Sequence, residues 1–454
     1  MNNQNHTSDT HSDTHTDTHT DTHTLNHWFT HIQQLHQKRI DLGLDRVGLV
    51  ADRLQLKNFL CPVITVAGTN GKGSTVKTLE SIYHQSGFKT ALYTSPHLLE
   101  FNERIRINHQ NIDDQNLIRA FEIIDNAREN SILSFFEFTT LAALYLFQQA
   151  ECNVIILEVG LGGRLDAVNI VESDVAVVTS IALDHMEWLG DNRESIAYEK
   201  ASIARDNKPL ICGEENPPKK IAETVREKNA VLYQINHDFF YKMTDSGMIC
   251  YAKNFHYHLP LPHLKPQNIA ITIAVIETLQ TQLPVTEENM IKGIQKTQWP
   301  GRFEYCEAPI PCILDVAHNP HAAHWLAEQY RRLPAVKNTI AVVGMLKDKA
   351  MTETVSVLLP LINTWYVCDL SSTTEERGAD GSVIAHFLKT SGIKNCYTFP
   401  AVSDAMHSLY QTHCQHECDR ALIFGSFYTV AAAKKWLAET ETGDSQWKKK
   451  SNNV

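Results

Sequence analysis

A glycine-rich loop at residues 66–74, with the sequence VAGTNGKGS, carries the clearest chemical signal in this chain. It lies between an apolar run typical of a buried strand and a segment typical of a helix, which is the setting that a phosphate cradle requires. Backbone N–H groups and the helix N-terminus can surround phosphate oxygens, while Lys72 supplies a charge near the β- and γ-phosphates. The lysine and its flanking elements favour this interpretation over a purely structural turn. The spacing is shorter than the standard Walker pattern, which points away from ordinary GTPases and kinases.

Acidic and basic side chains follow two further apolar runs. Glu158 closes the run 154–159, and Mg²⁺ in nucleotide sites favours one or two carboxylates together with phosphates. Taken alone, an acid at a strand end is more often a solvated residue or a helix partner. His185 follows the run 175–181, so it would point to the same sheet edge as the phosphate loop. Lys200, on the next predicted helix, is by itself typical of an exposed helix lysine.

The second half of the chain repeats this arrangement. Asp315 and His318 follow another apolar run and precede a predicted helix. These residues could close over a nucleotide from the far side of a cleft. Capping of the helix by Asn319, with Pro320 at its first position, explains the same pattern, and the two interpretations are compatible.

Two histidine-containing segments are weaker signals. The segment 413–418, HCQHEC, contains metal-ligand types, but its spacing matches no standard zinc pattern and it precedes a strand. Residues 1–24 are nearly all His, Thr, Asp and Asn, and such a segment cannot bury enough apolar surface to become ordered. We expect a disordered tail there, and a second polar tail at 441–454.

Alternating apolar and helical patterns predict the elements that position the candidate residues. Strands are expected at 61–67, 154–159 and 175–181, and helices at 72–85, 135–150, 265–282 and 287–296. Irregular polar sequence at 230–260 predicts a small antiparallel excursion. After a turn at 299–301, strands are expected at 312–316, 339–343, 365–369, 395–399 and 421–424.

These patterns predict an α/β protein. A P-loop ATPase domain with a parallel sheet, at 25–298, is followed by a smaller Rossmann-like α/β domain at 299–440. Ligands of open α/β sheets bind at the carboxyl ends of the strands, where the candidate residues lie.

Composition limits the classes of partner. The 454 residues carry a formal net charge of −11, and Lys and Arg are spread along the chain, so no nucleic-acid footprint is expected. No apolar run is long enough to span a bilayer. Ten cysteines without a paired framework, and no apolar leader, predict a reduced cytoplasmic protein, with a monomer as the default.

Together, the motifs resemble the folylpolyglutamate synthase and dihydrofolate synthase family of the Mur ligase superfamily, from about residue 25 to 440. The resemblance is carried by IDLGLDRV at 40–47, VAGTNGKGS at 66–74, TSPHL at 94–98, EVGLGGRLD at 158–166, LDH at 183–185, PGR at 300–302, DVAHNP at 315–320, GMLKDK at 344–349 and GSF at 425–427.

The resemblance implies an ATP-dependent amide ligase of the bifunctional bacterial type. Such an enzyme adds L-glutamate to dihydropteroate, and further glutamates to tetrahydrofolate and folylpolyglutamates, through an acyl phosphate. A Mur-type ligase that extends a cell-wall precursor is the nearest alternative, and the segments 40–47 and 94–98 favour folate. A non-enzymatic nucleotide switch is disfavoured by the two acid-and-histidine sites on separate sheets.

The resemblance also implies roles for particular residues. Those expected to bind ATP are Thr69, Asn70, Gly71, Lys72, Gly73, Ser74, Asn268, Arg302 and Asp315. Those expected to ligate two Mg²⁺ ions are Ser95, Glu158, His185 and Lys200, the last as a carbamate, whose oxygens suit Mg²⁺. Those expected to be catalytic are Lys72, His185, Lys200 and His318. Those expected to bind the pterin substrate are Gln34, Leu35, His36, Gln37, Ser134, Phe135, Phe136, Glu137, Leu165, Asp166 and Ala167.

Overall fold

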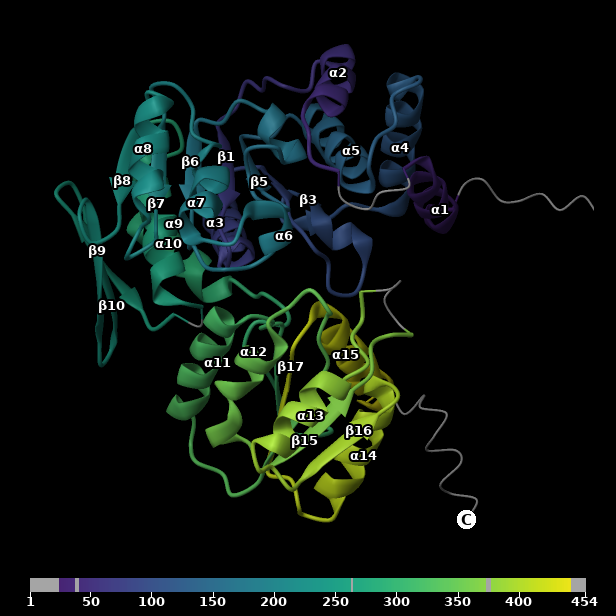
Figure 1. The fold of residues 1–454 in the computed structure, drawn as a ribbon. Helices are drawn as coiled ribbons and strands as arrows, with labels where there is room; N and C mark the ends of the chain where they lie inside the picture. Colours follow the sequence, from purple (N-terminus) through teal and green to yellow (C-terminus); the bar gives the residue numbers. More distant parts are fainter. Residues whose placement is uncertain (1–23, 37–40, 263, 373–376, 442–454) are drawn as a thin grey trace, which may run out of the picture.

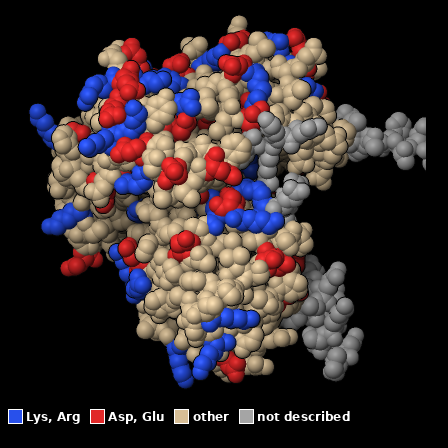
Figure 2. Space-filling model, in the orientation of Figure 1, with Lys and Arg blue, Asp and Glu red and all other residues tan. Residues whose placement is uncertain are grey.

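The computed structural model describes residues 24–36, 41–262, 264–372 and 377–441. These residues form two bodies, the first above the second in Figure 1. The tails expected at 1–24 and 441–454 lie outside the described residues, apart from Thr24 and Glu441. None of the helices in the described ranges could cross a membrane. On the face drawn in Figure 2, basic and acidic side chains are interspersed over both bodies.

The first body is built on an eight-stranded sheet with the order β4-β3-β2-β5-β1-β6-β7-β8. The strands are β1 Val63–Ala67, β2 Thr90–Tyr93, β3 Ile105–Ile107, β4 Gln110–Asn111, β5 Val154–Glu158, β6 Val175–Val178, β7 Pro209–Cys212 and β8 Val231–Gln234. The central strands β5, β1 and β6 are parallel and buried along their whole length. Such continuous apolar strands are typical of parallel sheets that helices cover on both faces.

Two separate cores lie on the two faces of this sheet. One face is covered by α3 Lys72–Gln85, α9 Pro266–Thr278 and α10 Glu287–Lys296. The other carries α1 Leu25–Leu35, α2 Asp45–Leu54, α4 Asp114–Arg128, α5 Phe135–Ala150, α7 Arg193–Ala201 and α8 Lys219–Glu227. The short helix α6 Met186–Leu189 and the 3-10 turns η1 Phe101–Arg104 and η2 Ala167–Ile170 complete this body.

The antiparallel excursion predicted at 230–260 is confirmed in part. β9 Phe239–Thr244, β10 Gly247–Ala252 and β11 His256–Pro260 form a separate antiparallel sheet at the left edge of Figure 1. The prediction is wrong for the first residues of 230–260. They form β8, which pairs in parallel with β7 and extends the main sheet. The strand predicted at 175–181 ends at Val178, because Ser180 accepts a hydrogen bond from the phosphate loop instead of from a neighbouring strand.

The second body contains a six-stranded sheet with the order β12-β13-β17-β14-β15-β16. Its strands are β12 Glu304–Cys306, β13 Cys312–Asp315, β14 Thr339–Val343, β15 Thr364–Cys368, β16 Cys396–Phe399 and β17 Arg420–Phe424. Its helices are α11 Pro320–Arg332, α12 Met351–Ser356, α13 Ser382–Thr390, α14 Val402–Cys414 and α15 Phe427–Glu441, with the turn η3 Leu359–Leu361. All its strand pairs are parallel except β12–β13. The predicted α/β class, with a larger nucleotide-binding part before a smaller Rossmann-like part, is confirmed. The exact bounds 25–298 and 299–440 stay a prediction.

Candidate active site

The loop between β1 and α3 has a shape that requires glycine. A Cβ atom on Gly68 would lie 1.8 Å from Thr179 Oγ1, and one on Gly71 would lie 2.6 Å from Asn268 Oδ1. Both glycines also have positive φ angles, 150° and 92°, which other residues rarely adopt. The loop can therefore approach β6 and α9 only because these positions lack side chains.

Hydrogen bonds hold the loop in place. Thr69 N donates to Ser180 O over 2.8 Å, and the Thr179 hydroxyl donates to Asn70 O over 2.8 Å. At the start of α3, Lys72 Nζ donates to the Gly68 carbonyl over 2.9 Å. Burial lowers the pKa of Lys72, against the attraction of nearby carboxylates. The ammonium group is thus held within the loop, where a phosphate would compensate its burial.

A buried acid anchors α3 behind the loop. Glu80 is fully buried and accepts hydrogen bonds from Lys77 Nζ at 3.1 Å and Arg106 Nε at 2.8 Å. The Lys77 ammonium also lies 5.1 Å from the Trp299 ring centroid, and the Trp299 indole covers Gly73 of the loop. This cluster connects the phosphate loop to the linker between the two bodies.

Glu158 ends β5 beside the loop and is 3% exposed. Its Oε2 accepts hydrogen bonds from the Thr94 hydroxyl and from Ser95 N, the latter at 3.3 Å, and none of the described residues donates to Oε1. Burial raises the pKa of this carboxyl, opposed by the charge of Lys72. A buried carboxylate with one oxygen still available fits a divalent cation, whose charge would offset the cost of burial.

Lys200 lies in the last turn of α7 and is only 4% exposed, so it is not an exposed helix lysine. Burial, with the charge of Lys72, lowers the pKa of Lys200 to about 7. Among the described residues, Nζ has no hydrogen-bond partner. About half of such amines are uncharged at neutral pH. The neutral amine is the form that reacts with CO₂, so the environment fits a carbamate.

His185 precedes α6 with a left-handed backbone, φ 51°. Burial lowers the pKa of its imidazole to about 4, so the ring is neutral at pH 7, which is the form that binds metal ions. The described residues contain no group of three His, Cys, Asp or Glu side chains suited to a metal ion. A cation held here would therefore take its remaining ligands from phosphates and water.

The second body supplies the opposite wall. Asp315, at the end of β13, accepts hydrogen bonds from Phe303 N and Ala317 N, each at 2.8 Å. The Arg302 guanidinium lies 5.3 Å from the Phe427 ring centroid. Burial lowers the pKa of Arg302, and the charge of Asp315 opposes this effect. The two bodies thus both contribute charged groups to one cleft.

A cavity of 220 Å³ lies between these walls. All the residues predicted to bind ATP, to ligate metal or to act in catalysis are among those that line it. They are Thr69, Asn70, Gly71, Lys72, Gly73, Ser74, Ser95, Glu158, His185, Lys200, Asn268, Arg302, Asp315 and His318.

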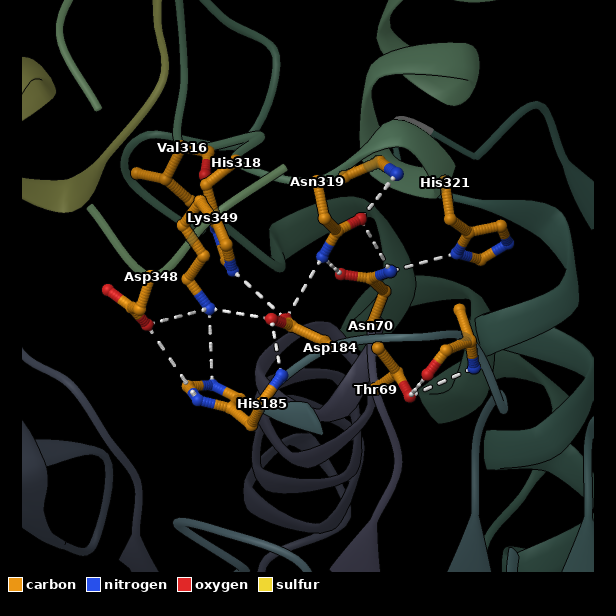
Figure 3. Close-up of polar contacts among 12 residues, drawn as sticks. Thr69, Asn70, Asp184, His185, Val316, His318, Asn319, His321, Asp348 and Lys349 are labelled. Carbon is orange, nitrogen blue, oxygen red and sulfur yellow. Dashed lines mark hydrogen bonds and ion pairs between the residues drawn. The ribbon is translucent and has the colours of Figure 1, made fainter. Parts of the chain in front are cut away.

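Asp184 joins the two bodies across this cavity (Figure 3). Its carboxylate accepts hydrogen bonds from Lys349 Nζ at 2.7 Å and Asn319 Nδ2 at 3.3 Å, and lies 3.6 Å from His318 Nε2. Burial alone would favour the protonated acid, but the nearby His318 and the charge of Lys349 hold the pKa of Asp184 well below its usual range. Asp184 is thus an ionised acceptor for two side chains of the second body and lies close to a third.

A second contact across the cleft pairs the phosphate loop with α11 (Figure 3). Asn70 Nδ2 donates to Asn319 Oδ1 at 3.2 Å, and Asn319 Nδ2 donates to Asn70 Oδ1 at 3.1 Å. Asn319 Oδ1 also accepts from Ala322 N at 2.9 Å, which confirms the predicted helix cap. Asn319 therefore caps α11 and contacts the phosphate loop at the same time.

A larger cavity of 510 Å³ adjoins the first. The residues that line both are Ser95, Pro96, Gly160, Leu161, His185, His318 and Phe427. A carboxylate at the end of a molecule in the larger cavity would therefore lie beside the phosphates of a nucleotide in the smaller one.

Several residues predicted to bind the substrate line this larger cavity, namely Ser134, Phe136, Glu137, Leu165, Asp166 and Ala167. Phe135 does not line it and packs against Phe29 and Phe101, with ring centroids 6.2 and 5.9 Å apart. Gln34 and Leu35, at the end of α1, also lie outside the lining, and Gln34 is exposed. His36 does not line the cavity but lies behind it, with Nε2 3.1 Å from the carboxylate of Asp41, which does. Gln37 lies outside the described residues.

Sequence reasoning missed a charged group at this end of the larger cavity. Arg46 Nε lies 2.9 Å from both carboxylate oxygens of Glu137, and its guanidinium also donates to the Asp41 carboxylate. Asp41 and Arg46 both lie in the segment IDLGLDRV, whose sequence indicates a family motif and no charge pairing. Arg46 and Glu137 are 91 residues apart, so their pairing cannot be seen in the sequence.

The histidine and cysteine segment at 413–418 has a local structural partner. His413 Nδ1 lies 2.9 Å from the Cys418 carbonyl oxygen, at the end of α14. One ring nitrogen is therefore engaged by the backbone.

Comparison with known proteins finds two family models in this chain. Residues 66–276 match the Mur ligase middle domain, and residues 301–427 match the glutamate ligase domain of Mur ligases. The chain is 42% identical over 417 residues to the dihydrofolate synthase/folylpolyglutamate synthase of Escherichia coli, covering 92% of this chain and 96% of that protein. It is 37% identical over 428 residues to the protein of the same name from Haemophilus influenzae, covering 89% and 95%.

Solved structures show the same similarity. The structure of E. coli FolC in complex with DHPP and ADP has a TM-score of 0.85 and 40% identity, covering 92% of this chain and 98% of that one. A bifunctional folylpolyglutamate synthase/dihydrofolate synthase with Mn, AMPPNP and L-glutamate bound has a TM-score of 0.83 and 38% identity, covering 91% and 98%.

Proposed function

This chain belongs to the dihydrofolate synthase/folylpolyglutamate synthase family of Mur ligases, and we propose that it joins glutamate to its acceptors at the boundary between its two cavities. It is an ATP-dependent ligase that adds L-glutamate to folates and uses a divalent metal ion. Its acceptors are dihydropteroate, and tetrahydrofolate with its polyglutamates.

One observation supports this location above the others. The smaller cavity is lined by the phosphate loop and the larger by several of the candidate pterin residues. They meet at Ser95, Pro96, Gly160, Leu161, His185, His318 and Phe427. An acceptor in the larger cavity would direct its carboxylate at the γ-phosphate of ATP. Such positioning is the main contribution that a protein makes to phosphoryl transfer.

The first step transfers the γ-phosphoryl group of ATP to the acceptor carboxylate, giving an acyl phosphate and ADP. Negative charge gathers on the transferred oxygens, and Lys72 lies in the loop where it can oppose that charge. In the second step, the uncharged amine of glutamate attacks the acyl carbon. The amide bond forms as inorganic phosphate leaves and a proton is released.

The residues at the smaller cavity fit two Mg²⁺ ions. Ser95 and Glu158 would hold one, and the available Oε1 of Glu158 would be its charged ligand. His185 and a carbamate on Lys200, which the low pKa and burial of that amine support, would hold the second. The ions would supply positive charge to the phosphate oxygens.

The second body would exclude water from the acyl phosphate. Asp184 accepts hydrogen bonds from Lys349 and Asn319 across the cleft and lies 3.6 Å from His318 Nε2. These contacts favour the closed arrangement of the two bodies. His318 Nδ1 lies 2.9 Å from the Val316 carbonyl, which fixes the ring with Nε2 facing the cleft. Closure of this kind protects reactive intermediates from hydrolysis.

The test is ADP formation by the full-length protein with ATP, Mg²⁺ and L-glutamate, scored with dihydropteroate and with tetrahydrofolate, together with detection of glutamate-extended products. Both acceptors should stimulate ADP release, and product should form in equal amount. ADP release that does not depend on either acceptor would contradict the proposal. Stimulation only by cell-wall precursors would instead support the Mur-type alternative.

We also expect a monomer that acts in the cytoplasm. None of the ten cysteines is in a disulfide, which agrees with a reducing compartment.

A further inference from the structure

The acidic side chains that line the larger cavity come from the first body, and most of its Lys and Arg side chains come from the second. Its acids, Asp41, Glu137 and Asp166, lie with the candidate pterin residues of the first body. Each already has partners, because Arg46 binds Asp41 and Glu137, and the Asp166 carboxylate accepts from Leu161 N and Val168 N. These acids therefore do not neutralise the basic residues elsewhere in the lining.

The second body contributes basic side chains to this cavity. Arg377 and Lys435 line it, and we call these two residues the basic wall. Arg377 donates from one terminal nitrogen to Asp348 at 3.0 Å. Its guanidinium group has further N–H donors beyond this bond.

Lys435 is the member of the basic wall without a charged partner among the described residues. It is exposed on α15. Phe427, Ala431 and Lys435 are four residues apart in turn and all line the cavity, so they share one face of the helix. The neighbouring Lys434 lies outside the lining and pairs with Glu304. Lys435 therefore presents a cation to the cavity that no described side chain neutralises.

The position of Lys435 separates it from the reacting atoms. Phe427 lies where the two cavities meet and stacks on Arg302. Lys435 is two helical turns further on, roughly 12 Å along the axis. An anion bound by Lys435 is thus not the carboxylate that receives the phosphoryl group.

Dihydropteroate and the folates differ in the number of carboxylates that stay free during the reaction. Dihydropteroate has one carboxylate, which the reaction consumes. Each γ-linked glutamate of a folate adds an α-carboxylate that stays free. We infer that the basic wall binds the α-carboxylates of the γ-glutamyl tail, and that Lys435 selects acceptors with longer tails. This inference rests on the proposed function.

The experiment compares kcat/KM for dihydropteroate, tetrahydrofolate monoglutamate and tetrahydrofolate diglutamate in the full-length enzyme. The variants are Lys435→Gln, Lys435→Glu and Arg377→Gln. Lys389→Gln is the matched control, because Lys389 is an exposed lysine of α13 outside both cavities. Lys435 is exposed, so its substitution should leave folding intact, and thermal unfolding checks this.

For Lys435→Gln, the ratio of kcat/KM for the diglutamate to that for dihydropteroate should fall roughly three- to fivefold, the size of an exposed ion pair. The fall should be larger for Lys435→Glu and smaller for the monoglutamate. Added salt should reduce the difference between wild type and variant, because it screens exposed charges. The control should keep the wild-type ratio.

An unchanged ratio in all the variants, while the wild type is active on every acceptor, would overturn the inference and leave the proposed function standing. A wild type that uses dihydropteroate but no glutamate-bearing folate would also overturn it. A wild type inactive with all three acceptors would refute the proposed function itself.

Discussion

The contact between Asp184 and Lys349 should control closure of the second body over ATP. The Lys349 side chain is 5% exposed and that of Asp184 is 9% exposed, and their charged atoms lie 2.7 Å apart. We predict that Lys349→Gln lowers kcat/KM for ATP while the first body stays folded. Lys347→Gln is the matched control, since Lys347 is an exposed lysine on the same segment and lies outside both cavity linings.

The magnitude follows from the contacts that remain. A hydrogen bond to a charged group contributes about 1.5–3 kcal/mol. Asp184 keeps Asn319 and His318 as neighbours after the change, so we expect a loss of about 2 kcal/mol, or roughly thirtyfold in kcat/KM. Asp184→Asn should cause the same loss, because both substitutions break the same contact.

The assay is acceptor-dependent ADP release, measured for the two single variants and the double variant. A coupling energy of about 2 kcal/mol between positions 184 and 349 is expected. Losses that simply add in the double variant would refute the reasoning, because Lys349 would then act by contacts other than Asp184. A Lys347→Gln enzyme as impaired as Lys349→Gln would refute it as well.

Three further predictions concern single groups. Burial alone would raise the pKa of Glu80, but the nearby His109 and the basic groups of Lys77 and Arg106 lower it to about 2, so its contribution to stability is present above about pH 4.5 and is lost as pH falls toward 2. Urea unfolding of Glu80→Gln should show a loss of about 3 kcal/mol at pH 7 and about 2 kcal/mol at pH 3.5, and equal losses at both pH values would contradict this. Lys200→Ala should lose most turnover, and ¹³C NMR with labelled bicarbonate should show a carbamate in the wild type that the variant lacks; a wild type without that signal would exclude the modification. Glu158→Ala should abolish Mg²⁺-dependent ADP release, and near wild-type release would remove Glu158 from the metal site.

Sequence patterns were sufficient for the class of fold and for the smaller cavity. Buried parallel strands are continuous apolar runs, and Val63–Ala67, Val154–Glu158 and Thr339–Val343 are of this kind. Residues that follow such strands must gather at one sheet edge, so Lys72 and Glu158 could be placed together in advance. The ends of the predicted elements were less accurate. The strand predicted at 175–181 ends at Val178, because the next residues contact the phosphate loop.

Only the tertiary structure decided the environment of each group and the contacts between the bodies. Lys200 looks like a surface lysine in the sequence, and its low pKa comes from being buried beside Lys72. Arg46 with Glu137, and Asp184 with Lys349, are separated by 91 and 165 residues. Short-range patterns in a sequence report which face of an element is apolar, whereas burial and pairing depend on which elements the whole chain brings together.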